Sequence, residues 1–102
     1  FIPVLAEAAL PENELKRVNA DGMPVLLVRK GQRIYAIAET CAHLGAPLSE
    51  GTLEGTSVRC PWHSSRYSLE DGSVLEAPSV HAQPVLDVRI RDGQIEVRES
   101  ND

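Results

Sequence analysis

Apolar and polar residues alternate through much of the chain with the two-residue period of a β-strand. Near the end, the apolar members of 86–91 alternate with charged residues, and a second alternating run follows at 94–97. Successive side chains of a strand point to opposite faces, so this pattern predicts strands with one buried face. The Asp-Gly pair at 92–93 is typical of the tight turn of a β-hairpin.

An earlier pair of runs has the same form. Residues 25–29 and 33–38 are rich in β-branched and other apolar side chains, and Lys-Gly-Gln separates them, which predicts another hairpin. Further turns are expected at Asp21-Gly22 and Asp71-Gly72.

Helix signals are weak by comparison. Only residues 5–16 are helix-like, and Pro11 interrupts them. The pattern therefore predicts an all-β sandwich or partly open barrel of short antiparallel strands. A length of 102 residues allows one domain, 1–102, with a single modest core.

Charge and hydropathy narrow the possible partners. The net charge is −5, and the ten basic residues are dispersed, which argues against nucleic acid and favours a basic protein surface. No apolar run is long enough to span a bilayer, and no secretion signal precedes the first strand. We expect a cytoplasmic protein. The chain starts at Phe1 rather than Met, which indicates a trimmed start or a domain taken from a longer protein.

The loop-rich region 41–65 contains both cysteines and two of the three histidines: Cys41, His43, Cys60 and His63. A structural disulfide is the simplest reading of the two cysteines, but a histidine close to each favours a metal site. Two Cys and two His also suit tetrahedral zinc, although zinc fingers place both cysteines first. The order Cys, His, Cys, His fits a 2Fe-2S cluster in which one iron has two thiolates and the other has two imidazoles.

At these residues the sequence resembles the Rieske domain family. The segments CAHLG and CPWH, with sixteen residues between His43 and Cys60, are similar to its C-x-H and C-x-x-H motifs, and the similarity continues through SLEDGSVLEAP to the last hairpin. The resemblance implies that Cys41 and Cys60 bind one iron, and that His43 and His63 bind the other. It also implies three small antiparallel sheets with a loop-rich cluster-binding tip, formed by residues 40–48 and 60–67, and a loop at Pro78 that covers the cluster.

Departures from the family pattern also carry information. Membrane-complex members join the two loops by an extra disulfide. This chain has Ala46 and Trp62 at the matching positions, so we expect its tip to lack that disulfide, as in soluble Rieske ferredoxins. Ser65 and Tyr67 stand where high-potential members have hydroxyls that bond to the cluster's sulfurs, so we expect both to form hydrogen bonds with it. Ser64 replaces a common glycine, which raises a question about the local backbone.

The predicted function is single-electron transfer by a ferredoxin-like carrier, with a reductase and a terminal oxygenase as partners. Only His81 remains outside the motifs, which is too few for the two-His-one-carboxylate iron of an oxygenase, and we expect it at the surface. No catalytic residue and no Rossmann fingerprint is found. The alternatives are a domain of a longer oxidoreductase, an accessory like the small subunit of nitrite reductase, and a zinc-stabilised binding module.

Overall fold

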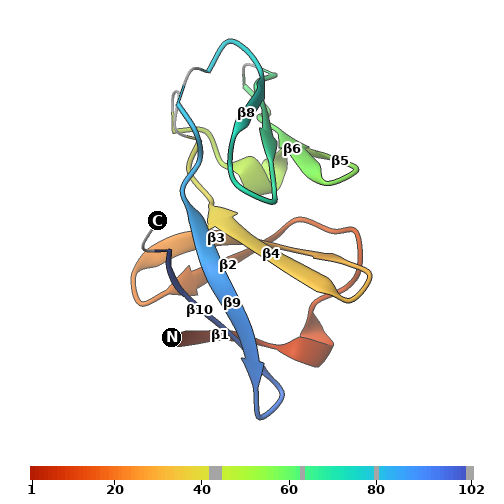
Figure 1. Cartoon of the computed structure of the whole chain (residues 1–102), viewed down its shortest axis with the longest axis vertical. Coiled ribbons are helices and arrows are strands. Elements are labelled where there is room, and N and C mark those ends of the chain that lie inside the picture. Colours follow the sequence, from red (N-terminus) through yellow and green to blue (C-terminus); the bar gives the residue numbers. More distant parts are fainter. Residues whose placement is uncertain (42–44, 63, 80, 101–102) are drawn as a thin grey trace.

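The described part of the chain contains ten β-strands and two short 3-10 helices, joined by turns and loops. The computed structural model describes residues 1–41, 45–62, 64–79 and 81–100. No helix in these ranges is long and apolar enough to cross a membrane. The described strands form two antiparallel sheets rather than the three that the family resemblance implied, because six strands pair continuously in one of them. The two sheets lie one above the other in Figure 1.

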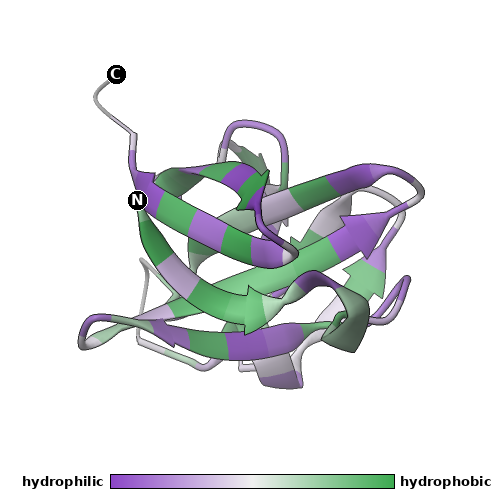
Figure 2. Cartoon of the chain, turned by 90° about the horizontal axis from the view of Figure 1, so that it is seen from below, coloured by the Kyte–Doolittle hydropathy of each residue, from purple (hydrophilic) through white to green (hydrophobic). Residues whose placement is uncertain are grey.

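The larger sheet has six strands in the order β1-β10-β9-β4-β3-β2. Its two edge strands, β1 and β2, also contact each other, so the sheet curls towards a barrel. Figure 2 shows the alternation of hydrophilic and hydrophobic positions along its strands. The bounds are β1 Ile2–Ala6, β2 Lys16–Ala20, β3 Met23–Lys30, β4 Arg33–Ala38, β9 Val85–Arg91 and β10 Gln94–Glu99.

The smaller sheet is a meander of four three-residue strands in the order β5-β6-β7-β8. They are β5 Thr52–Glu54, β6 Ser57–Arg59, β7 Arg66–Ser68 and β8 Val74–Glu76. The chain leaves the larger sheet after β4 and returns to it at β9, so the smaller sheet is one continuous excursion (Figure 1). Both loops that contain the cysteines belong to this excursion.

Strand β3, between β4 and the edge strand β2, separates two hydrophobic clusters. Leu26 and Val28 belong to a cluster that includes both cysteines, whereas Val25 and Leu27 pack into the interior of the larger sheet. All four side chains are fully buried. Burial on both faces explains why this strand is a continuous apolar run rather than an alternating one.

The predicted hairpins are confirmed. Residues 30 and 33 pair across the first, and residues 91 and 94 pair across the second, which leaves two-residue turns in both. Asp21-Gly22 is a third such turn, and Asp71-Gly72 lies between β7 and β8. At Gly72, φ is +76° and an added Cβ would lie 1.9 Å from the carbonyl oxygen of Gln83, so this turn has no room for a side chain.

The weak helix signal at 5–16 does not produce an α-helix. Its first residues end β1, and Glu7–Ala9 form a single 3-10 turn. The Arg29 side chain donates to the carbonyls of Glu7 and Leu10 at 3.0 and 3.1 Å. Because Pro11 prevents further helical bonding, this turn is held by β3 rather than by a helix.

Candidate functional site

The two cysteine-containing loops are built alike. In the first, the Cys41 N–H donates to Ala46 O at 2.8 Å, and the Gly45 N–H donates to Cys41 O at 2.8 Å. In the second, the N–H of Cys60 donates to Ser65 O at 2.7 Å, and the N–H of Ser64 donates to Cys60 O at 3.1 Å. Each cysteine therefore begins a tight loop that closes on it four and five residues later. The motif histidines His43 and His63 lie outside the described residues.

The fifth residue of each loop adopts the left-handed backbone conformation. φ is +79° at Gly45 and +62° at Ser64. Serine in place of the family's common glycine therefore does not change the backbone of the loop. Ser64 adopts the left-handed conformation although a residue with a side chain disfavours it. Such a conformation costs on the order of 1 to 2 kcal/mol for a residue with a Cβ.

Both cysteines are buried in one hydrophobic cluster. Cys41 is 3% exposed and Cys60 is 2% exposed, and neither is in a disulfide. The structural-disulfide reading is therefore not supported. Two thiols that are buried in one cluster, each at the first residue of a matched loop, suit a metal group bound by two thiolates.

Tyr67 joins the two loops. It lies in β7, directly after the second loop, and its fully buried ring places Oη 3.1 Å from Sγ of Cys41 in the first loop. Burial, and then the hydrogen bond with Cys41, raises the pKa of Tyr67 to about 12. The phenol therefore keeps its proton at neutral pH, and it can donate to a deprotonated Cys41 sulfur.

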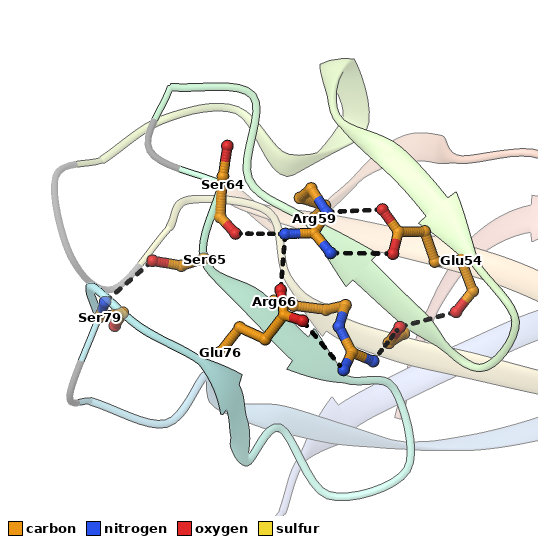
Figure 3. Close-up of polar contacts among 8 residues, drawn as sticks. Glu54, Arg59, Ser64, Ser65, Arg66, Glu76 and Ser79 are labelled. Carbon is orange, nitrogen blue, oxygen red and sulfur yellow. Dashed lines mark hydrogen bonds and ion pairs between the residues drawn. The ribbon is translucent and has the colours of Figure 1, made fainter.

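Ser65 is fully buried at the end of the second loop. Its Oγ accepts a hydrogen bond from the Ser79 N–H at 2.9 Å (Figure 3), and this bond ties the segment after β8 to the loop. A hydroxyl that accepts through oxygen still has its own hydrogen to donate. The same bond brings the segment that contains Pro78, the predicted covering loop, to the second cysteine loop, and Pro78 itself is exposed.

Two further predicted residues lie at the surface. Trp62, between the second cysteine and its histidine, is 59% exposed. His81 is also exposed, as predicted. Its backbone N–H and carbonyl bond with the hydroxyl of Ser79, at 3.3 and 3.2 Å.

A buried carboxylate closes the base of the first loop. Glu39, two residues before Cys41, is 2% exposed. Its oxygens accept hydrogen bonds from the N–H and hydroxyl of Ser49, at 2.8 and 2.5 Å. Thr40 and Pro47 form a β-bridge beside this contact, so both ends of the loop are fixed.

An Arg–Glu network supports the second loop (Figure 3). The guanidinium of Arg59, adjacent to Cys60, donates to Ser64 O at 2.8 Å and contacts Glu54 at 2.6 Å and Glu76 at 2.7 Å. Arg66 lies 3.6 Å from Glu76 and completes the set. Hydrogen bonds from Arg59 lower the pKa values of Glu54 and Glu76.

Sequence reasoning missed Arg59, Glu76 and Ser79. Each is an ordinary strand or loop residue in the printed sequence. Arg59 and Glu76 pair between strands of the smaller sheet, and Ser79 has its partner, Ser65, in the second cysteine loop. The only sequence signal was the position of Arg59 directly before a candidate ligand. Of the residues that were predicted, Cys41 and Cys60 lie in one buried cluster, Tyr67 contacts Cys41, and Ser65 closes the loop that Cys60 begins.

Comparisons with known proteins agree with this geometry. Residues 1–92 match the family described as Rieske [2Fe-2S] domain. Ferredoxin CarAc of Metapseudomonas resinovorans is 32% identical over 98 residues, which cover 95% of this chain and 92% of that protein. The ferredoxin of carbazole 1,9a-dioxygenase from Nocardioides aromaticivorans IC177 superposes with a TM-score of 0.91 at 27% identity, covering 97% of both chains.

A third match is part of an assembly. It is a chain of the complex of reduced oxygenase and oxidized ferredoxin in carbazole 1,9a-dioxygenase. The TM-score is 0.87 at 32% identity, covering 95% of this chain and all of that one.

Proposed function

Since this chain belongs to the Rieske [2Fe-2S] domain family, we propose that Cys41 and Cys60 bind one iron of its cluster and that His43 and His63 bind the other. The chain is a single-electron carrier with a Rieske-type 2Fe-2S cluster. When bound, the cluster accepts one electron and passes it on without transferring any atom. Neutral imidazoles on one iron leave less negative charge to oppose the electron than four thiolates would.

The observation that carries the ligand assignment is the burial of two thiols in matched loops bridged by Tyr67. Two cysteines that lie in one buried cluster, one of them in contact with a tyrosine hydroxyl, and that are not joined by a disulfide fit a thiolate-bound group. With Cys41 as a thiolate, the phenol of Tyr67 is the donor of the 3.1 Å contact. The Ser65 hydroxyl, held by Ser79, supplies the second donor at the tip.

These two donors give the protein control over the potential. Added negative charge on reduction strengthens a hydrogen bond to sulfur, so each donor stabilises the reduced state more than the oxidised state. The surrounding apolar side chains exclude water and raise the strength of both bonds.

We further propose that the carrier receives electrons from a reductase and delivers them to a terminal oxygenase, in the cytoplasm, without catalysing the oxygenation itself. The similarity to a chain of an oxygenase–ferredoxin complex supports this partner class. Protein that has been reduced in advance and is mixed, without oxygen, with an oxidised candidate oxygenase should be reoxidised while the oxygenase is reduced in step. Reoxidation no faster than in buffer alone would argue against this partner.

The ligand assignment is tested by metal analysis of histidine variants. His43→Ala and His63→Ala should each lose most of the iron and labile sulfide, which the intact protein should contain in about a 1:1 ratio. His81→Ala is the matched control, because His81 is exposed and lies outside both motifs. Full iron content in either motif variant, or one zinc in the intact protein, would overturn the assignment.

A further inference from the structure

One guanidinium connects three segments around the second cysteine loop. Arg59 ends β6, and it reaches Glu54 of β5, Glu76 of β8 and the carbonyl of Ser64 in the loop itself. These segments are consecutive in neither the sheet nor the sequence. Figure 3 shows Arg59 between them.

The geometry needs arginine rather than any cation. Arg59 binds both oxygens of Glu54, at 2.6 and 3.0 Å, with Nε and Nη2, while Nη1 serves Glu76 and Ser64 O at 2.7 and 2.8 Å. A planar fork can make these contacts at once, whereas the single ammonium of lysine cannot. Lysine would, however, preserve the charge.

The first group that Arg59 contacts is the carbonyl of Ser64, a residue with a strained backbone conformation. Ser64 has φ of +62°, which a residue with a side chain adopts only where its surroundings impose it. The 2.8 Å bond to Ser64 O fixes the peptide that joins Ser64 to Ser65. Arg59 therefore acts on the backbone that carries the Ser65 hydroxyl.

The second group that Arg59 contacts, Glu76, connects it to the Ser65 hydroxyl through the segment after β8. Glu76 ends β8, and three residues later the Ser79 N–H donates to Ser65 Oγ at 2.9 Å. Because Arg59 anchors Glu76, it also anchors the start of the segment that orients this oxygen. Both routes from Arg59 converge on Ser65.

We propose that Arg59 is a positioning residue for electron transfer: acting through Ser64 and Glu76, it fixes the orientation of the Ser65 hydroxyl and thereby raises the reduction potential. The inference rests on the proposed role of Ser65 as a hydrogen-bond donor to the cluster. The proposed role depends on the planar shape of the Arg59 guanidinium and not on its charge. Arg59→Lys, which keeps the charge, should therefore still change the reduction potential.

The test compares reduction potentials of intact, cluster-containing proteins by protein-film voltammetry. Arg59→Lys should make reduction less favourable by about threefold, which is about 28 mV for a one-electron couple at 59 mV per tenfold. Arg89→Lys is the matched control, because Arg89 contacts Glu96 at 2.6 Å in the larger sheet. The control should leave the potential unchanged.

A double variant separates this inference from the proposed function. In a Ser65→Ala background, Arg59→Lys should no longer change the potential, because the hydroxyl that it positions is gone. If Ser65→Ala lowers the potential but Arg59→Lys does not, or if the two effects add, the positioning role is wrong and the role of Ser65 stands. If Ser65→Ala itself has no effect, both are wrong.

A second variant keeps the test decisive if Arg59→Lys does not fold. Glu76→Asp retains the carboxylate but shortens its reach by one methylene, so it weakens the contact with Arg59. Glu76→Asp should therefore lower the reduction potential, as Arg59→Lys does. Glu96→Asp in the larger sheet should leave it unchanged. Equal potentials for these two variants would overturn the inference.

Discussion

The hydroxyl of Tyr67 lies 3.1 Å from the sulfur of Cys41, although 26 residues separate them in the sequence. The contact joins the strand after the second loop to the first residue of the other loop. It therefore links the two halves of the proposed cluster site with one fully buried side chain.

Removing this hydroxyl should lower the reduction potential. A hydrogen bond to a charged group contributes on the order of 1.5 to 3 kcal/mol, and we assign about 1 kcal/mol to the difference between redox states. Tyr67→Phe should then lower the potential by about 40 mV, as measured by protein-film voltammetry. Tyr35→Phe is the control, because Tyr35 is also buried but its ring stacks with Arg33. A Tyr67→Phe potential within about 10 mV of wild type, with an intact spectrum, would show that the contact does not tune the cluster.

Ser65→Ala should have a similar effect, with a drop of about 40 mV by the same argument. The alanine also leaves the buried Ser79 N–H without its acceptor, so cluster release should be faster. Ser68→Ala, in the adjacent strand, is the control, because its hydroxyl accepts from the Glu70 N–H in a solvent-exposed contact. An equal potential in both variants would argue against a bond from Ser65 to the cluster.

The left-handed residues of the two loops should respond in opposite ways to substitution. Ser64→Gly removes the strain at φ of +62°, whereas Gly45→Ala creates it at φ of +79°, where the added Cβ has only an ordinary 3.7 Å contact with Thr40. We expect about 1 kcal/mol of stabilisation for the first and of destabilisation for the second. Thermal unfolding should shift up and down by about 4 °C. Shifts of the same sign would contradict the proposed strain.

Gly72→Ala should destabilise the protein by more than the cost of placing alanine at a positive φ, because the new Cβ would also clash with a neighbouring backbone. The new Cβ would lie 1.9 Å from the carbonyl oxygen of Gln83, so the junction between the sheets would have to move. Gly93→Ala is the matched control, since φ is +77° there and nothing lies within 4 Å. The Gly72 variant should unfold at least several degrees below the Gly93 variant in a thermal melt; equal midpoints would mean that the clash is relieved at little cost.

The Glu54–Arg59 pair should contribute a pH-dependent part of the stability. Arg59 lowers the pKa of Glu54 below its ordinary value of 4.5, so the folded state favours the carboxylate. This contribution is present above about pH 4.5 and is lost as the pH falls through the lowered pKa. The difference in melting temperature between wild type and Glu54→Gln should therefore be larger at pH 6 than at pH 3. A difference that grows towards pH 3 would have the wrong sign.

The hairpins of the larger sheet were predictable because local signals determine them. The turns at Asp21-Gly22, Gly31-Gln32 and Asp92-Gly93 all place residues at positive φ, and β-rich runs, either alternating or continuously apolar, flank them. The strands of the smaller sheet have three residues each, which is too short to show a period. They exist because they pair with one another around the two cysteine loops.

The candidate site was predictable only where its chemistry is unusual. Cysteine and histidine at fixed spacing indicated Cys41 and Cys60, and the family resemblance added Ser65 and Tyr67. Arg59 and Glu76 left no such signal, because arginine and glutamate are common in exposed strands and a salt bridge between strands depends on the fold. The family resemblance drew attention to position 64, where a glycine is common, but serine itself is a poor indicator of positive φ, so its left-handed conformation is known only from the structure.

Voltammetry of the intact wild-type protein shows whether the chain carries one electron on a cluster with two thiolate and two imidazole ligands. We expect a reversible one-electron wave between about −150 and +300 mV, the range of Rieske centres. A wave near about −400 mV, as in plant-type ferredoxins with four cysteine ligands, or the absence of any wave, would contradict it.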